Sequence, residues 1–190
     1  MNVTAPVDPK VCPPGYYMLF VLNNGVPSVA KIVRVQQGQT TSFFPTAVPA
    51  TSASGQGSTW EQGLEFSSSV SGQITHVRFW KALGEPAGNH FARIWSTNGT
   101  QLVSVPFGCE SPAGWQEVQL PTPFQVTAGV RYRVTYNIQS VGAKTFNTLD
   151  NPITVGSLTG WRSYFSTPAG SFPTTSSGSN LFVDIVFKTP

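Results

Sequence analysis

Hydrophobic and polar residues alternate with a period of two along most of the chain, which is the pattern of half-buried β-strands. In residues 130–139, one set of alternate positions carries tyrosine, valine and isoleucine, while the other carries arginine and threonine. Short runs of this kind are separated by turn residues at intervals of about 8 to 12 residues, as in β-sandwiches. The predicted strands are residues 59–66, 73–81, 91–96, 101–107, 115–120, 130–139, 161–166 and 181–188. Because no sustained stripe of helical period is present, we predict an all-β fold, an antiparallel and jelly-roll-like β-sandwich.

The first part of the chain has a different pattern, with apolar residues on both faces of a predicted β-hairpin at residues 15–35. Its turn is Asn23-Asn24-Gly25, whose residues accept positive φ angles. A strand pair that is apolar on both faces is not stable alone in water, so we expect partner strands or a covering sheet.

The composition then becomes linker-like, rich in Gln, Thr, Ser, Ala, Pro and Gly. We therefore predict three parts. They are a partial immunoglobulin-like domain at residues 1–36, a linker at residues 37–58 in which Phe43-Phe44-Pro45 forms the first anchoring segment, and a β-sandwich domain at residues 59–190.

Charge is sparse in this sequence and limits the classes of partner. Only 10% of the 190 residues are charged, against about 25% in an average soluble domain. The lysines and arginines behind the net charge of +3 are scattered singly along the sequence. Nucleic-acid-binding proteins concentrate such residues on one stripe or run, so we expect no nucleic-acid partner. No run approaches the roughly 18 apolar residues of a membrane span, and the N-terminus lacks the pattern of a signal peptide.

The acids and histidines match no familiar catalytic pattern. Glu61 and Glu65 lie four residues apart on one predicted strand, which separates them by about 13 Å, whereas a glycosidase pair needs about 5 to 10 Å. Glu110 and Glu117 flank a predicted turn and are expected to be exposed to solvent. The sequence contains no Gly-x-Ser-x-Gly elbow, no glycine-rich phosphate loop and no His-Glu-x-x-His motif. We therefore expect no enzymatic activity, no metal site and no cofactor.

Aromatic side chains are the remaining candidates for a binding surface. In the predicted strand at residues 73–81, Val77 and Phe79 suit the core, which turns His76, Arg78 and Trp80 outward or toward the neighbouring layer. An exposed indole beside hydrogen-bonding groups offers a flat surface to the C–H face of a sugar ring. The candidate ligand-binding residues are Trp80, Arg78, His90, Trp161 and Tyr164. Since tryptophan is highly buried on average, each ring is either such a platform or part of the packing.

Residues 13–35, with the sequence PPGYYMLFVLNNGVPSVAKIVRV, closely resemble the end of the C-terminal immunoglobulin-like domain of galactose oxidase and glyoxal oxidase, the kelch copper-radical oxidases. The resemblance covers only the last strands of that domain. The copper-binding tyrosines and histidines of that family lie elsewhere and have no counterpart here. The resemblance therefore does not imply oxidase activity.

The remainder, residues 43–187, resembles a bacterial family of unknown function that is appended to secreted, multidomain chains. The matching residues are Phe44-Pro45, Gly63, Phe66, Arg78-Phe79-Trp80-Lys81, His90, Trp95, Gly99, Leu102, Gly114-Trp115-Gln116-Glu117-Val118, Gly129, Tyr132, Tyr136 and Val183-Asp184-Ile185-Val186-Phe187. Cys12 and Cys109 stand where the resemblance leads us to expect other small or polar residues. They either form one disulfide between the two parts of the chain or are two buried, inert thiols.

Two hypotheses for function arise from the residues and the resemblances together. In the first, the chain is a noncatalytic, secreted accessory module that binds polysaccharide or another cell-surface glycan through exposed aromatic residues. In the second, it is a structural subunit of an extracellular assembly, which self-associates by strand complementation through residues 15–35.

Overall fold

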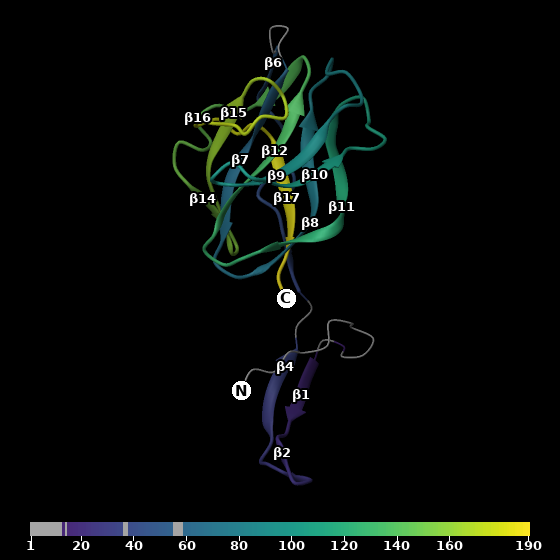
Figure 1. Cartoon of the computed structure of the whole chain (residues 1–190), viewed down its shortest axis with the longest axis vertical. Coiled ribbons are helices and arrows are strands. Elements are labelled where there is room, and N and C mark those ends of the chain that lie inside the picture. Colours follow the sequence, from purple (N-terminus) through teal and green to yellow (C-terminus); the bar gives the residue numbers. More distant parts are fainter. Residues whose placement is uncertain (1–12, 14, 36–37, 55–58) are drawn as a thin grey trace. The chain divides into compact units, whose positions relative to one another are not determined.

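The computed structural model describes residues 13, 15–35, 38–54 and 59–190, in which every helix or strand element is a β-strand. The chain divides into two compact units, residues 1–39 with Pro190 and residues 40–189 (Figure 1). The antiparallel all-β architecture predicted from the alternating pattern is therefore confirmed.

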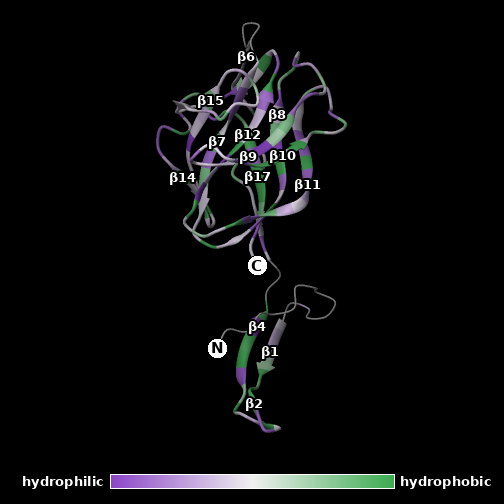
Figure 2. Cartoon of the chain, in the orientation of Figure 1, coloured by the Kyte–Doolittle hydropathy of each residue, from purple (hydrophilic) through white to green (hydrophobic). Residues whose placement is uncertain are grey.

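The first unit contains a β-hairpin. Strand β1 (Gly15–Leu19) pairs antiparallel with β4 (Lys31–Val35), from Gly15 opposite Val35 to Leu19 opposite Lys31. The tip is formed by β2 (Leu22–Asn23) and β3 (Val26–Pro27), joined through Asn24 and Gly25 with φ angles of 48° and 81°. Two successive positive φ angles define the type I′ turn, whose twist matches that of the flanking strands. Figure 2 shows hydrophobic residues along this hairpin.

The second unit is a sandwich of two antiparallel sheets (Figure 1). The seven-stranded sheet has the order β10-β9-β12-β7-β15-β14, with β16 also paired to β15. Its strands are β7 (Trp60–Ser68), β9 (Phe91–Ser96), β10 (Gln101–Pro106), β12 (Arg131–Ile138), β14 (Ile153–Val155), β15 (Leu158–Ser166) and β16 (Thr175–Ser177).

The four-stranded sheet has the order β11-β8-β17-β5. Its strands are β5 (Thr40–Thr41), β8 (Gly72–Lys81), β11 (Gly114–Val126) and β17 (Val183–Lys188). A separate pair joins β6 (Thr51–Ser54) to β13 (Val141–Lys144). The chain crosses repeatedly from one sheet to the other, so neighbouring strands within a sheet are often distant in sequence.

The core lies between the two sheets and follows the alternation of each strand. On β12, Tyr132, Val134, Tyr136 and Ile138 are buried, so Arg131 and Arg133 point to the outer surface of the seven-stranded sheet. Leu64 and Phe66 of β7 join them from the same sheet, and the largely hydrophobic β17 contributes from the other (Figure 2). The core therefore determines which side chains each sheet presents outward.

Strand β11 is longer than the predicted strand at residues 115–120. Its register passes from Gln119 opposite His76 to Phe124 opposite Ile74, so Pro121 and Pro123 fall in the irregular step between them. Proline has no N–H for the ladder and is tolerated at such a bulge, particularly on an edge strand. The prolines therefore interrupt the pairing without ending the strand.

Candidate functional site

The five predicted site residues lie in three separate places, and the first is the outer surface of the four-stranded sheet. Trp80 packs edge-on against Trp115 and Phe182, with ring centroids 5.8 and 6.3 Å apart. The Arg78 guanidinium lies 4.5 Å from the centroid of the Trp115 ring and 3.9 Å from a carboxylate oxygen of Asp184. Both side chains are half-buried by these contacts.

Residues 43–47 are tied to this same sheet by hydrogen bonds. The backbone N–H groups of Phe43 and Phe44 donate to the two Asp184 carboxylate oxygens at 2.8 and 3.0 Å. The Trp115 indole N–H donates to the carbonyl oxygen of Ala47 at 3.0 Å. Burial raises the pKa of Asp184, and these N–H donors and Arg78 oppose that rise. The chain's own residues therefore occupy the surface around Arg78 and Trp80.

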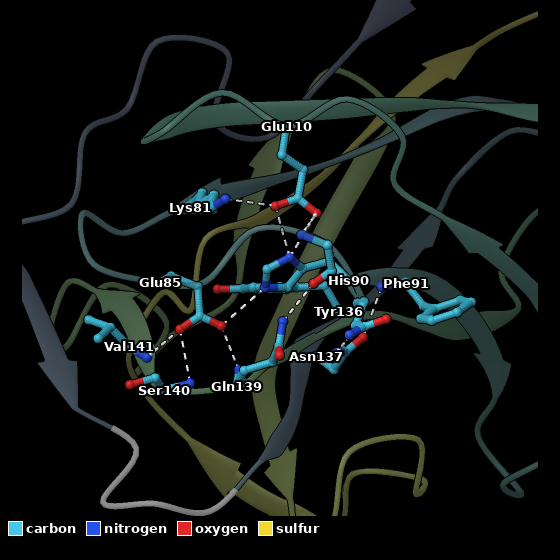
Figure 3. A network of polar contacts seen from close by, with 12 residues as sticks. Lys81, Glu85, His90, Phe91, Glu110, Tyr136, Asn137, Gln139, Ser140 and Val141 are labelled. Atoms are coloured by element: carbon cyan, nitrogen blue, oxygen red, sulfur yellow. Dashed lines mark hydrogen bonds and ion pairs between the residues drawn. The ribbon is translucent and has the colours of Figure 1, made fainter.

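His90 is in a second place, a polar cluster in the interior (Figure 3). Its side chain has 0% exposure and lies between two carboxylates. The Nδ1 atom is 2.9 Å from Glu110 Oε1, and the Nε2 atom is 3.1 Å from Glu85 Oε1. Glu110 also pairs with the buried Lys81 ammonium at 2.9 Å. Backbone N–H groups from residues 139–141 complete the hydrogen bonding of Glu85.

The charge state of this cluster follows from its geometry. A carboxylate only accepts hydrogen bonds, so an imidazole between two of them is best satisfied when both ring nitrogens donate. Burial alone lowers the pKa of His90, but its hydrogen bonds to Glu85 and Glu110 and their charges outweigh burial and raise it. Burial raises the pKa of Glu85, yet the donors around it, His90 first, produce a net lowering.

The position of Glu110 corrects an expectation from the sequence. Its carboxylate was predicted to be exposed beside a turn, but the side chain is 2% exposed because Lys81 and His90 supply compensating positive charge. Although Glu85 and Glu110 approach the same group, the His90 ring fills the space between them. The arrangement fits a buried ion network that joins three loops.

Trp161 and Tyr164 lie in the third place, on the outer surface of the seven-stranded sheet. A register shift in β15 between Gly160 and Arg162 marks a bulge at Trp161. The Trp161 indole N–H donates to Ser67 Oγ at 3.0 Å, and the guanidinium carbon of Arg131 lies 3.7 Å from the ring centroid. The guanidinium carbon of Arg133 lies 3.5 Å from the Tyr164 ring centroid. Both predicted aromatic residues therefore stack with an arginine of β12.

Glu65 of β7 organises the arginines of this surface. Its carboxylate accepts from Arg131 NH1 and Arg133 Nε, both at 3.0 Å. Arg162 stands directly opposite Glu65 in the register of β15 and β7, so its side chain emerges on the same surface. We refer to these six residues, Glu65, Arg131, Arg133, Trp161, Arg162 and Tyr164, as the arginine–aromatic face.

One end of the arginine–aromatic face is covered and the other is open. Phe172 packs on Arg133, and Gly170 donates its N–H to Glu61 at 2.9 Å, which brings residues 170–172 over this part of the sheet. The Arg133 side chain is consequently only 11% exposed, whereas that of Arg131 is 45% exposed. The open end is therefore formed around Arg131, against which the half-buried Trp161 ring packs.

The arginine partners of Trp161 and Tyr164 were not predicted from the sequence. Four of the six arginines, Arg93, Arg131, Arg133 and Arg162, point outward from the seven-stranded sheet, although they are scattered in the sequence. The alternation at residues 130–139 placed Arg131 and Arg133 on one side, which was the available signal. Their aromatic partners come from a strand that pairs with β7 rather than with β12, and alternation does not report such neighbours.

The remaining predictions concern cysteines, metals and membranes. Cys109 is an exposed free cysteine. Cys12 lies outside the described residues, so the disulfide stays a prediction, whereas the exposure of Cys109 contradicts the alternative of two buried thiols. No group of three or more His, Cys, Asp or Glu residues arranged for a metal ion is found in the described ranges. The same ranges contain no helix with the length and hydrophobicity to cross a membrane.

Comparison with known proteins confirms the two resemblances. Residues 1–35 match the family "Galactose oxidase-like, Early set domain". A WSC domain-containing protein of Arthroderma benhamiae is 58% identical over 34 residues, and an aldehyde oxidase GLOX of Vitis pseudoreticulata is 59% identical over 32 residues. These alignments cover 18% and 17% of this chain but only 4% and 6% of the two relatives.

The sandwich that carries the arginine–aromatic face and the His90 cluster has its own match. The family "Domain of unknown function (DUF4082)" matches residues 46–183, which are most of the chain and nearly all of the second unit. The match is compatible with an accessory domain. The chain belongs to this family.

Proposed function

We propose that the second unit is a noncatalytic accessory module of a secreted protein and that it binds polysaccharide through the arginine–aromatic face. The observation that carries the proposal is the open end of this face, where the Trp161 ring and the Arg131 guanidinium are stacked 3.7 Å apart. Aromatic rings match the C–H faces of sugars, and a guanidinium supplies hydrogen-bond donors to their oxygens. Of the five residues suggested by the sequence, the proposal retains Trp161 and Tyr164.

The contacts of the acids support a noncatalytic role. Glycoside hydrolysis needs two carboxylates that flank a substrate bond. Glu61 and Glu65 on the outer surface are instead held by arginines, with Glu61 Oε2 2.7 Å from Arg93 NH1. Glu85 and Glu110 are occupied by His90 in the interior. These pairings leave the acids in structural roles.

The proposal is tested by titrating the whole chain with a panel of soluble polysaccharides and following intrinsic tryptophan fluorescence and migration in polysaccharide gels. We expect Trp161→Ala to weaken binding about tenfold, the equivalent of about 1.4 kcal/mol. Phe146→Ala is the matched control because Phe146 is an exposed aromatic in the turn after β13. Equal effects of the two substitutions, or no retention by any polysaccharide, would contradict the proposal.

The hairpin of the first unit favours a second candidate function, self-association by strand complementation. Its apolar side chains are exposed on both faces, with Tyr16 74% and Ile32 66% accessible on one face and Leu19 39% accessible on the other. Among the described strands, β1 and β4 pair only with each other, so the outer edge of β4 has no strand partner there. Such edges accept a further strand.

Sedimentation of the whole chain over a range of concentrations tests this candidate. We expect a dimer or larger species that dissociates when Ile32 is changed to Lys. Lys31→Gln is the matched control, because it alters the neighbouring position on the same strand without adding charge to the apolar surface. A chain that stays monomeric at every concentration would rule out self-association.

A further inference from the structure

The arginine–aromatic face carries more positive charge than it neutralises. It contains three arginines and one acid, Glu65, which accepts hydrogen bonds from both Arg131 and Arg133. Arg162, opposite Glu65 in the register, forms no ion pair with any described acid. The chain as a whole has only 11 lysines and arginines against 8 acids, so this face holds an unusual share of its positive charge.

The three arginines differ in what they offer to a ligand. Arg133 donates to Glu65 and to the carbonyl oxygen of Pro173, and the rings of Tyr164 and Phe172 lie against it. It is therefore engaged by the protein itself. Arg131 donates through NH1 to Glu65 while remaining 45% exposed, and its other guanidinium N–H groups are available at the open end.

From this arrangement we propose that the polysaccharide bound by the arginine–aromatic face is anionic, with its carboxylate or sulfate groups held by Arg131 and Arg162. The inference rests on the proposed function and specifies its ligand class. The forked donors of a guanidinium match the paired oxygens of a carboxylate or sulfate, and such charge-assisted bonds are stronger than neutral ones.

A neutral polysaccharide fits the same surface less well. Covering Arg131 and Arg162 with an uncharged chain would remove water from two cations without supplying a compensating charge, which is costly. An acidic sugar supplies that charge. Trp161 precedes Arg162 at the bulge and its ring packs against Arg131, so both arginines lie next to one indole and can pair with acid groups of one saccharide.

The test compares four soluble probes in calorimetric titrations of the whole chain. Polygalacturonate carries carboxylates, its fully methyl-esterified form does not, dextran sulfate carries sulfates, and dextran is neutral. We expect at least one acidic probe to bind about tenfold or more tightly than its neutral counterpart. Comparing polygalacturonate with dextran sulfate identifies which acid group is preferred.

Three variants separate a site from general charge attraction. Arg162→Gln removes a cation with no ion pair in the described structure, so the fold should persist, and binding of the acidic probe should fall about tenfold. Arg162→Lys keeps the charge without the fork and should give an intermediate loss. Lys188→Gln removes the same charge from an exposed position on β17 and should change binding less than twofold.

The outcomes distinguish this inference from the proposed function. Equal losses for Arg162→Gln and Lys188→Gln would show nonspecific attraction and overturn the inference. Binding of neutral probes as tightly as acidic ones, with dependence on Trp161, would also overturn it while supporting the proposed function. Failure of all four probes to bind would count against both.

Discussion

The two outer surfaces of the sandwich are built from the same kinds of residue but differ in what lies over them. On the four-stranded sheet Arg78 stacks on Trp115, and on the seven-stranded sheet Arg131 stacks on Trp161. The Arg78 side chain is 14% exposed because the chain's own contacts enclose it, whereas Arg131 is open. Whether an arginine–tryptophan pair is an internal contact or a candidate ligand surface therefore depends on whether other residues of the chain lie over it.

The largest predicted effect concerns the hydrogen bonds that tie residues 43–44 to the four-stranded sheet. Asp184→Ala removes the buried acceptor of three backbone N–H groups, those of Phe43, Phe44 and Ile185, and a partner of Arg78. We expect the free energy of unfolding to fall by about 4 kcal/mol, measured by urea denaturation. Glu117→Ala, which removes the exposed partner of Arg78, should cost less than about 1 kcal/mol. A small effect of Asp184→Ala would mean that these hydrogen bonds do not hold residues 43–47 on the four-stranded sheet.

The His90 cluster lies in the interior, so the cost of breaking its ion pairs can be compared with that of breaking the pairs on the two outer surfaces. His90→Gln should lower the free energy of unfolding by about 3 kcal/mol near pH 6, because it leaves Glu85 and Glu110 without their shared cation. The raised pKa of His90 means that its stabilisation is complete below its ordinary value of 6.5 and is lost as pH rises through the raised value.

At acidic pH, stability changes with pH in the opposite direction, because Glu85 rather than His90 then titrates. The lowered pKa of Glu85 means that its stabilisation is present above its ordinary value of 4.5 and is lost as pH falls through the lowered value. The stability difference between the wild type and His90→Gln should therefore be greatest between about pH 4.5 and 6.5 and should shrink at higher pH. Urea denaturation across pH 4 to 9 measures it, and a difference that grows at alkaline pH would contradict a charged His90.

A pair of tryptophan substitutions tests the comparison of the two surfaces directly. Trp80→Ala removes packing against Trp115 and Phe182 and should cost about 2 kcal/mol of stability, while leaving polysaccharide binding unchanged. Trp161→Ala should cost less stability and should weaken binding. Thermal unfolding measures stability and gel retention measures binding. If Trp80→Ala weakened binding and Trp161→Ala did not, the four-stranded sheet and not the seven-stranded sheet would carry the ligand surface.

The smallest predicted effect on stability is that of Arg162→Gln. Because Arg162 forms no ion pair within the described structure, its removal should change the free energy of unfolding by less than about 0.5 kcal/mol. Arg78→Gln should cost more, since Arg78 contacts Glu117, Asp184 and Trp115. Urea denaturation of both variants checks this, and a similar loss for each would place Arg162 in the structural framework as well.

The strands of the sandwich were predictable because alternation is a local property. At residues 73–81 and 130–139 the period of two also identified a buried side, as where Arg131 and Arg133 were assigned to the opposite side from Tyr132 and Val134. The turn at Asn24 and Gly25 was likewise predictable from the residues that tolerate positive φ. The strands β5, β14 and β16 of the two sheets were not predicted, because they are only two or three residues long.

The candidate site was only partly predictable. Trp161, Tyr164, Trp80 and Arg78 were all selected as outward-facing residues, and all four are half-buried. Around Arg78 and Trp80 the chain's own residues Pro45 and Phe182 make the contacts. Glu110 was misassigned because its compensating charges, Lys81 and His90, are 29 and 20 residues away in sequence. Local patterning does not report the distant partner that decides whether an acid is buried.

The alternating pattern by itself determined that this protein is an antiparallel β-structure and, at residues 130–139, which side chains turn outward, because those properties depend on neighbouring residues. Only the tertiary structure decided which outward side chains meet and which are covered. Glu65 and Arg131 are 66 residues apart, and their contact depends on the pairing of β7 with β12. Burial and charge compensation are set by such long-range contacts, so the character of each surface appears only when the sheets are assembled.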